Sequence, residues 1–397
     1  MFVLNLPIHF ISLNGSPLLI LSVHNLGHRL ATFAMAHGTD SNRDMPSNES
    51  AKIAMWKEAL KNPPKPYVEP PPVIPSAYTL VSEAGRGLSA TAYFCLPKTA
   101  VKAPTSKEPD VLSQAVKTLA SELQVVKVFA NSGSPFMRPE LTILKEIQQR
   151  CQGQLEELPL IELLGWDTTN VVPDWIAMST MPVCCDLASL TGCFDQMPEE
   201  FIWLVYAQVH RALDFLHNTC NIAHGDLHIG NVIVGYSGSN NSGLPEVKLI
   251  DFGLSQCSPS ESRLILYMNL FDKDIEGLLR ILESILQDSL LKCAFCNCCL
   301  EARFNERCAA KICNFYKAVD RELGSYSYVS SSFPAKLWKD YGSHAMNAVD
   351  SCSDTSRKHI RDVILNTTRI RREVNEAKIE EILATAYDEA STSCSVQ

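Results

Sequence analysis

The sequence lacks an excess of positive charge. Among its 397 residues, 44 aspartates and glutamates outnumber 35 lysines and arginines, which gives a formal net charge of -9. Proteins that coat nucleic acid need a basic surface for the phosphates, so this balance argues against that class and leaves room only for a local basic cleft. We therefore predict no nucleic-acid partner. The contents of charged (20%) and hydrophobic (46%) residues are those of an ordinary globular protein.

Residues 1–23 contain no Asp, Glu, Lys or Arg, and this absence first suggests a membrane span or a signal peptide. Prolines, a glycine and asparagines within the stretch argue against a spanning helix; they are Asn5, Pro7, Asn14, Gly15 and Pro17. The missing basic segment argues against a signal peptide, although residues 31–36 resemble a cleavage site. Translation from Met35 or Met45 is a third possibility. No later stretch is apolar enough to cross a bilayer, so no stable membrane span is predicted.

The 15 cysteines do not follow the dense, even pattern of a small secreted scaffold, so reduced thiols are expected. Residues 293–299, with Cys308 and Cys313, allow two interpretations. The first cysteines have the CxxC spacing of zinc sites, but four residues separate the second pair and no histidine lies nearby. We favour buried thiols on a helix surface. The expected location is the cytoplasm, with the nucleus as an alternative.

Prolines are concentrated in one segment of the chain. Seven of the 22 prolines lie between Pro63 and Pro75 and predict a stiff linker. We therefore expect a domain boundary near Ser76, with residues 1–75 as an N-terminal extension. No internal repeat is apparent.

Strands are predicted first along the remaining chain. Residues 77–96 read as two strands joined by a glycine turn, and residues 123–130 and 174–183 as buried strands. Residues 97–121 are rich in Lys, Thr, Ser and Pro and indicate a surface insert.

Helices follow the strands. In residues 138–151, Leu141, Leu144 and Ile147 share one face. Apolar residues also recur at helical spacing in residues 198–217; they are Ile202, Val205, Val209, Ala212, Leu213 and Leu216. A further helix is predicted over residues 272–291. Strands followed by helices indicate an α+β fold, with a small β-rich lobe and a larger helical lobe.

The last helix predicted is charged and amphipathic. It covers residues 369–390, with Ile370, Val374, Ala377 and Leu383 facing one way. This tail helix docks either on the protein's own helical lobe or on a partner, and we favour the first.

Two loops beside apolar strands carry the candidate chemistry. The string "HGDLHIGN" supplies Asp226 and Asn231, and "DFG" supplies Asp251. Transfer of a phosphoryl group from ATP requires a carboxylate to orient the attacking hydroxyl and oxygen ligands for Mg²⁺. Asp226 fits the first requirement, and Asn231 and Asp251 fit the second.

The same transfer requires backbone N–H groups and a lysine at the phosphates. Gly85 and Gly87 in "GRGLSA" allow close backbone approach. Lys127 in "VVKVF" is the candidate lysine, and Glu140, thirteen residues later on a helix, can pair with it. Lys102 and Glu146 are the rivals, but Lys127 has the more apolar flanks and Glu140 immediately precedes the apolar helix face.

Residues from about 76 to 290 resemble the protein-kinase-like fold. The resemblance is carried by the glycine-rich loop (without its third glycine), the strand lysine, the helix glutamate, the H-x-D-x-x-x-x-N loop and the DFG turn, in that order. It implies a bilobal protein, with a kinase N-lobe over residues 76–181 and a C-lobe over residues 182–350. A charged helical tail follows over residues 351–397. The implied cofactors are ATP and Mg.

The resemblance also implies roles for further residues. "MSTMPV" resembles the hinge, with Met178 in the gatekeeper place and Met181 offering its backbone to adenine. His228 lies where Ser/Thr kinases carry a lysine on the γ-phosphate. Asp274 resembles the aspartate that opens a buried helix in the family.

The chain also departs from the family. Gly225 replaces the arginine that grips a phosphorylated activation loop in regulated kinases, so switching by such a phosphate is not expected. Only 22 residues separate Asp251 from Asp274 and no A-P-E triplet is present, as in small atypical kinases of the RIO family and the KEOPS tRNA-modification complex. "HGDLHIGN" is closer to the loop of aminoglycoside and choline phosphotransferases. A neutral His228 holds phosphate less strongly than a lysine, which predicts modest turnover.

Three functions are compatible with these residues. The first is phosphorylation of protein Ser/Thr, the second is phosphorylation of a small-molecule hydroxyl, and the third is a pseudokinase that binds or scaffolds. Retention of Lys127, Asp226, Asn231 and Asp251 together argues against the third. His228 and the short activation segment favour the second, whereas the DFG turn and the helix glutamate favour the first. We choose the protein Ser/Thr kinase.

Overall fold

A computed structural model of the chain describes residues 9–13, 16–20, 73–87, 89–129, 137–151, 153, 157–170, 173–195, 197–237, 243–257, 264–291, 311–324 and 333–394. The chain divides into two units, Met1–Pro72 and Val73–Gln397. In the first unit, β1 (His9–Leu13) and β2 (Ser16–Ile20) pair antiparallel, with Leu13 opposite Ser16. The remainder of the expected N-terminal extension and its proline-rich linker lies outside the described residues, apart from Val73–Pro75.

A five-stranded antiparallel sheet begins the second unit, in the order β3-β4-β5-β7-β6. The strands are β3 (Tyr78–Arg86), β4 (Ala90–Pro97), β5 (Gln124–Phe129), β6 (Leu163–Trp166) and β7 (Trp175–Ser179). Their β-branched and aromatic residues suit a half-buried pleated surface. The strands predicted within residues 77–96, 123–130 and 174–183 are confirmed, whereas β6 has no clear sequence signal.

Two helices accompany this sheet. Helix α4 (Met137–Arg150) buries Leu141, Leu144 and Ile147 as predicted. Helix α3 (Pro109–Ala120) lies within the segment for which the composition indicates only a surface insert, and Pro109 occupies its first turn. It buries Val116 and Leu119 in a small core with residues of β3, β4 and the last helix.

The rest of the unit is mostly helical, so the predicted α+β class is confirmed. Its helices are α5 (Leu187–Leu190), α6 (Glu199–Asp214), α7 (Leu264–Leu291), α9 (Lys311–Gly324), α10 (Phe333–Asp350), α11 (Asp354–Thr367) and α12 (Arg369–Cys394). Helix α6 continues into a π-helical turn, η2 (Phe215–Cys220), which ends at the left-handed Asn221. The six apolar residues predicted to share the buried side of residues 198–217 are all buried.

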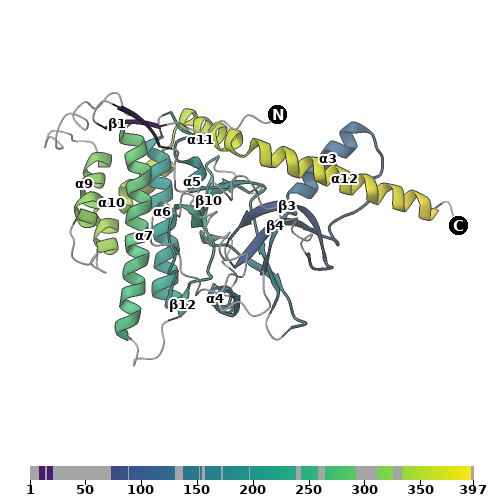
Figure 1. The fold of residues 1–397 in the computed structure, drawn as a ribbon, viewed down its shortest axis with the longest axis horizontal. Coiled ribbons are helices and arrows are strands. Elements are labelled where there is room, and N and C mark those ends of the chain that lie inside the picture. The colour runs from purple at the N-terminus through teal and green to yellow at the C-terminus, as the bar shows by residue number, and fades with distance from the viewer. Residues whose placement is uncertain are drawn as a thin grey trace. The chain divides into compact units, whose positions relative to one another are not determined.

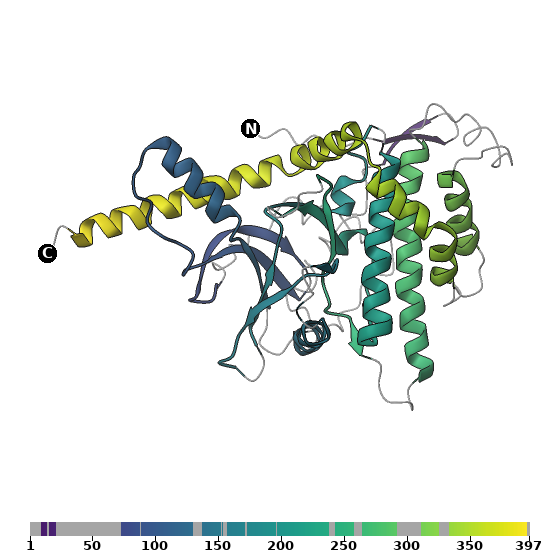
Figure 2. The ribbon, with the colours of Figure 1, turned by 180° about the vertical axis from the view of Figure 1, so that it is seen from behind.

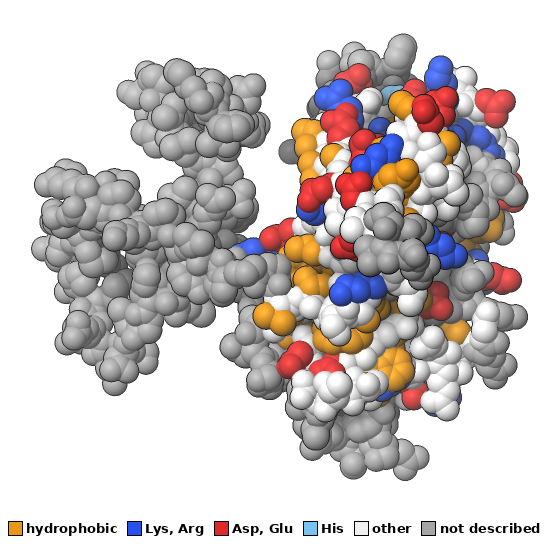
Figure 3. Space-filling model, turned by 90° about the vertical axis from the view of Figure 1, so that its right-hand side faces the viewer, with side chains coloured by type: hydrophobic (Ala, Val, Ile, Leu, Met, Phe, Trp, Pro, Cys, Tyr) orange, Lys and Arg blue, Asp and Glu red, His pale blue; other side chains and the backbone are white. Residues whose placement is uncertain are grey.

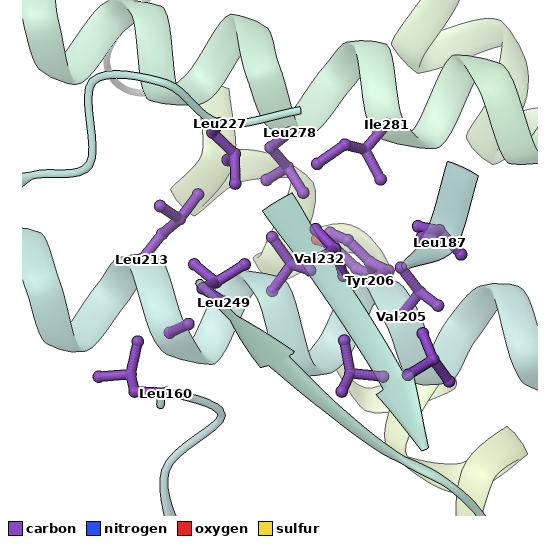
Figure 4. Packing of buried hydrophobic residues seen from close by; sticks show 14 of the residues in the cluster. Leu160, Leu187, Val205, Tyr206, Leu213, Leu227, Val232, Leu249, Leu278 and Ile281 are labelled. Atoms are coloured by element: carbon purple, nitrogen blue, oxygen red, sulfur yellow. The ribbon is translucent and has the colours of Figure 1, made fainter. Parts of the chain in front are cut away.

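Short strands connect these helices to the larger core. β8 (Val183–Asp186), β10 (Val232–Tyr236) and β11 (Glu246–Leu249) form an antiparallel sheet, and β9 (Ile222–Ala223) pairs with β12 (Gln256–Cys257). Figure 4 shows apolar side chains of α6, α7, β10 and β11 pointing toward one another. This packing fixes the loops that leave β9 and β11, which carry Asp226 and Asp251.

Helices α11 and α12 form the charged tail. α11 contacts β8 and α5, and α12 continues past β3 and α3, as both ribbon views show (Figures 1 and 2). The predicted apolar face of α12 is wrong for three of its four residues. Ile370 and Val374 are 71% and 52% exposed and Ala377 is exposed, whereas Leu383 is buried.

The buried face of α12 follows a different stripe, at Asn375, Ile379 and Leu383, which recur every four residues. The apolar pattern missed this stripe because one of its members is polar. Asn375 is accommodated in the interior because its Oδ1 accepts a hydrogen bond from the Ser82 hydroxyl of β3.

Two further sequence predictions concern a membrane span and the cysteine-rich stretch. No helix within the described parts of the chain is both long and apolar enough to cross a membrane. Most of the cysteine-rich stretch lies outside the described residues, and Cys313 is buried on α9. On the face seen in Figure 3, acidic and basic side chains are interspersed with hydrophobic ones rather than gathered by sign.

Replacing Leu383 by alanine should lower the free energy of unfolding by about 2–5 kcal/mol, because a buried leucine loses its transfer free energy and leaves a cavity. Val374→Ala, on the exposed side of the same helix, is the matched control and should change the free energy by no more than about 0.5 kcal/mol. Urea unfolding followed by circular dichroism measures both. Equal effects would contradict the packing of α12 on the sheet.

Candidate active site

The site is centred on Lys127, whose ammonium group lies between two carboxylates. Its Nζ lies 2.8 Å from both Oε1 and Oε2 of Glu140 on α4, and 2.9 Å from Oδ1 of Asp251 after β11. Lys127 faces Ala92 across the β4–β5 pair, so a small side chain lies opposite the lysine. The predicted pair of Lys127 and Glu140 is thereby brought together, and the rivals Lys102 and Glu146 are not part of it.

The electrostatics of this cluster keep the lysine charged. Burial acts to lower the pKa of Lys127, but Glu140 and Asp251 outweigh it, and the pKa lies above its ordinary value. For Asp251, burial acts to raise the pKa, but the charge and hydrogen bond of Lys127 dominate and the pKa is lowered. Glu140 is 1% exposed and burial raises its pKa, although Lys127 opposes the shift. The ammonium group of Lys127 therefore keeps its positive charge and is held in place by three carboxylate oxygens.

The loop that follows β9 brings Asp226 and Asn231 together. Nδ2 of Asn231 donates to the backbone oxygen of Asp226 at 2.8 Å and to its Oδ2 at 3.3 Å. A backbone carbonyl oxygen can only accept a hydrogen bond, so the Asn231 amide is oriented with Nδ2 toward Asp226 and Oδ1 facing elsewhere. The side chain of Asp226 is 42% exposed, so its carboxylate is accessible from the cavity.

His228 lies beside this carboxylate without bonding to it. Its Nε2 is 3.8 Å from Oδ2 of Asp226, and its side chain is 54% exposed. Its Nδ1 accepts a hydrogen bond from the Gly230 amide at 3.0 Å, so the proton of the neutral ring is on Nε2, toward Asp226.

The backbone of the same loop is held by Asp274, which is buried on α7. Its carboxylate accepts hydrogen bonds from the amides of His224 and Gly225, each at 2.7 Å, and lies 2.9 Å from Nε2 of His217. The buried His224 ring directs Nε2 to the Ile250 carbonyl at 3.0 Å, and burial lowers its pKa below the ordinary value. A neutral histidine therefore joins the loop to the strand end before Asp251.

Gly225 has a backbone reason to be glycine. Its φ is +80°, in the left-handed region, and a Cβ there would lie 2.6 Å from the Leu254 carbonyl oxygen. Gly225 stands where the kinase-like sequence pattern has an arginine, and the two loops of the site approach each other closely at this position.

Asp251 also adopts the left-handed conformation, with φ 64°. Aspartate tolerates this region better than most residues, but it still costs about 1–2 kcal/mol. The neighbouring Phe252 is buried, with its ring centroid 5.0 Å from that of His224. These contacts hold the turn so that the Asp251 carboxylate reaches Lys127, and strain of this kind is often found at functional sites.

A cavity of about 550 Å³ contains these groups, within the usual size of small-molecule sites. It is lined by most of the predicted site residues, namely Gly85, Gly87, Lys127, Glu140, Met178, Asp226, Asn231 and Asp251. The space beside Gly85 is open, whereas the Gly87 amide donates to the Ala90 carbonyl at 2.9 Å within the turn.

Two predicted residues do not line this cavity. Met181 is buried and lines a neighbouring cavity of about 1270 Å³, which shares Ser179 and Thr180 with this one. Within residues 178–183, the lining of the first cavity comes from Met178, Ser179 and Thr180. His228 lies outside the lining, although it neighbours Asp226.

The donor set fits a magnesium ion accompanied by phosphates. Oδ1 of Asn231 and Oδ2 of Asp251 form no hydrogen bond with another described residue, and both residues line the cavity. Mg²⁺ commonly takes one or two protein oxygens and completes its shell with water and phosphate. No group of three or more His, Cys, Asp or Glu able to hold a metal occurs among the described residues, so a metal bound by protein ligands alone is not indicated there.

Several residues that line the cavity are not among the predicted site residues, and three of them are Phe94, Asp186 and Arg371. Phe94 of β4 and Asp186, at the start of α5, line the cavity near the hinge. Asp186 does carry a local signal, because its carboxylate caps α5 by accepting from the Ser189 amide at 2.7 Å. Arg371 of α12 has no local signal, since only the tertiary fold brings the tail to this cavity.

Replacing Asp274 by alanine should lower the free energy of unfolding by about 3 kcal/mol, because two backbone N–H groups lose their acceptor at about 1–3 kcal/mol each. Asp272→Ala on the same helix is the control, since Asp272 forms no hydrogen bond with another described residue, and it should shift stability by about 0.5 kcal/mol or less. Thermal and urea unfolding measure the difference. A similar stability of both variants would contradict the anchoring role.

No protein-family model matches the chain, and no curated protein matches it either. The interpretation of the cavity therefore rests on the residues that line it. They combine one partly buried ammonium, two loop carboxylates and an oriented amide around a cavity of the size usual for small-molecule sites.

Proposed function

We propose that this chain is an ATP- and Mg-dependent phosphotransferase that phosphorylates serine or threonine hydroxyls of a protein. The observation that carries the proposal is the position of Lys127, bound to Glu140 and Asp251 on the wall of a cavity that Asp226 and Asn231 also line. The sheet and the helical part would be the two lobes of a kinase-like fold, with the cavity at their junction.

Each residue then has a defined task. Lys127 would hold negative phosphate oxygens, and Glu140 would keep its ammonium in place. Asp226 would orient the attacking hydroxyl and accept its proton, which its exposure permits. Bound Mg²⁺ supplies neutralisation of phosphate charge, and Asn231 and Asp251 are the residues that would hold it.

A protein acceptor is favoured by the openness of the acceptor side. Both Asp226 and His228 are about half exposed, so the carboxylate is accessible to a side chain presented by a large partner. Selection of a small alcohol would instead need an enclosed pocket around the hydroxyl. His228 and the short segment before Asp274 support the alternative, a small-molecule kinase similar to aminoglycoside and choline phosphotransferases.

Asp226→Asn should reduce phosphoryl transfer by about 10²–10⁴-fold while leaving ATP affinity nearly unchanged, because an amide cannot accept the proton. The assay uses labelled ATP with magnesium and measures autophosphorylation, transfer to generic protein substrates and transfer to a panel of small alcohols. Asp195→Asn, at an exposed aspartate outside the cavity lining, is the control.

The three acceptor classes separate in this assay. Transfer to protein hydroxyls supports the proposal, and transfer to alcohols alone supports the small-molecule alternative. Nucleotide binding without any transfer by the parent protein would indicate a pseudokinase. Equal transfer by the parent and by Asp226→Asn would remove Asp226 from the chemistry.

Asp251→Asn tests the metal assignment separately. Asparagine tolerates the left-handed backbone at this position, so the variant should fold, but it loses the charge that would attract Mg²⁺. Addition of magnesium should therefore tighten ATP binding to the parent protein at least several-fold more than to the variant. Calorimetric titration with and without magnesium measures this difference, and an identical magnesium effect in both proteins would contradict the assignment.

A further inference from the structure

The C-terminal helix crosses the edge of the cavity at its hinge end. α11 contacts β8, the strand that follows the hinge, and α12 then contacts β3 and α3. Both ribbon views show α12 running from the helical part past the sheet (Figures 1 and 2). The tail therefore forms a second connection between the two walls of the cavity, in addition to the hinge.

Three contacts fix α12 against the sheet. The hydrogen bond from Ser82 to Asn375 joins it to β3, and Ile379 and Leu383 enter the core that contains Phe94 and Leu96. Because Asn375 lies one turn after Arg371, the position of Arg371 is set by packing rather than by a free tail.

The strand register shows which end of the cavity Arg371 reaches. Ser82 pairs with Phe94, Phe94 with Val125, and Val125 with Met178. The Arg371 guanidinium lies 5.9 Å from the centroid of the Phe94 ring. Lys127 is two residues further along β5, roughly 7 Å away along the strand. Arg371 is thus level with the hinge and not with the lysine.

Arg371 has no charged partner of its own. It lines the cavity, yet it forms no hydrogen bond or ion pair with any residue that the structure describes, and its only ring contact there is the one with Phe94. Arg86, which lines the opposite end, pairs with Glu83 at 2.9 Å. An arginine that faces a cavity without a partner retains all its donors for a ligand.

We infer that Arg371 binds the nucleoside part of the nucleotide and so makes the C-terminal helix a component of the nucleotide site. This inference rests on the proposed function. A planar guanidinium stacks on the face of an aromatic base and donates hydrogen bonds to ribose hydroxyls. Phosphate is the less suitable partner because its site is set by Lys127 at the other end of the sheet register.

The experiment measures dissociation constants of adenosine, ADP, ATP with magnesium and inorganic tripolyphosphate for the full chain and for Arg371→Ala. Arg369→Ala is the matched control, because Arg369 is exposed on the same helix, pairs with Glu373 at 4.0 Å and does not line the cavity. Arg371→Ala should weaken adenosine, ADP and ATP by a similar factor of roughly 3- to 30-fold. Tripolyphosphate binding should not change, and Arg369→Ala should match the parent protein for every ligand.

Two results would overturn the inference alone. One is unchanged binding of all nucleotides by Arg371→Ala in a parent protein that binds ATP. The other is a loss that grows with the number of phosphates and appears with tripolyphosphate, which would make Arg371 a phosphate ligand. Failure of the parent protein to bind ATP with magnesium at millimolar concentration would overturn the proposed function itself. Because Arg371 is exposed, thermal unfolding of both variants should match the parent and exclude misfolding.

Discussion

A partly buried ammonium ion is stabilised by nearby carboxylates, and this pairing organises the site. Lys127 lies on the sheet, Glu140 on α4 and Asp251 after β11, so one cation joins three elements far apart in the sequence. Loss of Lys127 would leave two neighbouring carboxylates without a cation, whereas loss of either carboxylate would leave a single ion pair. The orientation of α4 and the unusual backbone of Asp251 both serve this one cluster.

The buried carboxylate of Asp274 holds backbone groups of the site in place, as Lys127 holds side chains. Asp274 accepts two loop amides and approaches His217, while the neutral His224 connects the same loop to the carbonyl before Asp251. The two loops that would carry the chemistry are thereby coupled through main-chain groups. Their relative position depends little on the side chains of Asp226 and His228, which are both about half exposed.

The sequence was informative where a signal is local. Strand composition located β5 and β7, helical spacing located the buried faces of α4 and α6, and the spacing of polar residues in two loops identified Asp226, Asn231 and Asp251. The sequence was not informative where tertiary packing determines which residues are buried or line the cavity. The face of α12 is set by Asn375 bonding to a strand nearly three hundred residues earlier, and the place of Arg371 follows from that docking. Met181, expected to offer its backbone to adenine, lines the neighbouring cavity instead.

The main chain at Gly225 has a consequence for regulation. Gly225 has a left-handed backbone, and the Leu254 carbonyl oxygen lies 2.6 Å from where a Cβ would be. The loop therefore has no room for the arginine that the kinase-like sequence pattern carries at this position. The substitution Gly225→Arg would push the two loops apart, because its Cβ would clash with the Leu254 carbonyl oxygen. Under the proposed function, this backbone would exclude switching by a phosphate that an arginine at position 225 would bind.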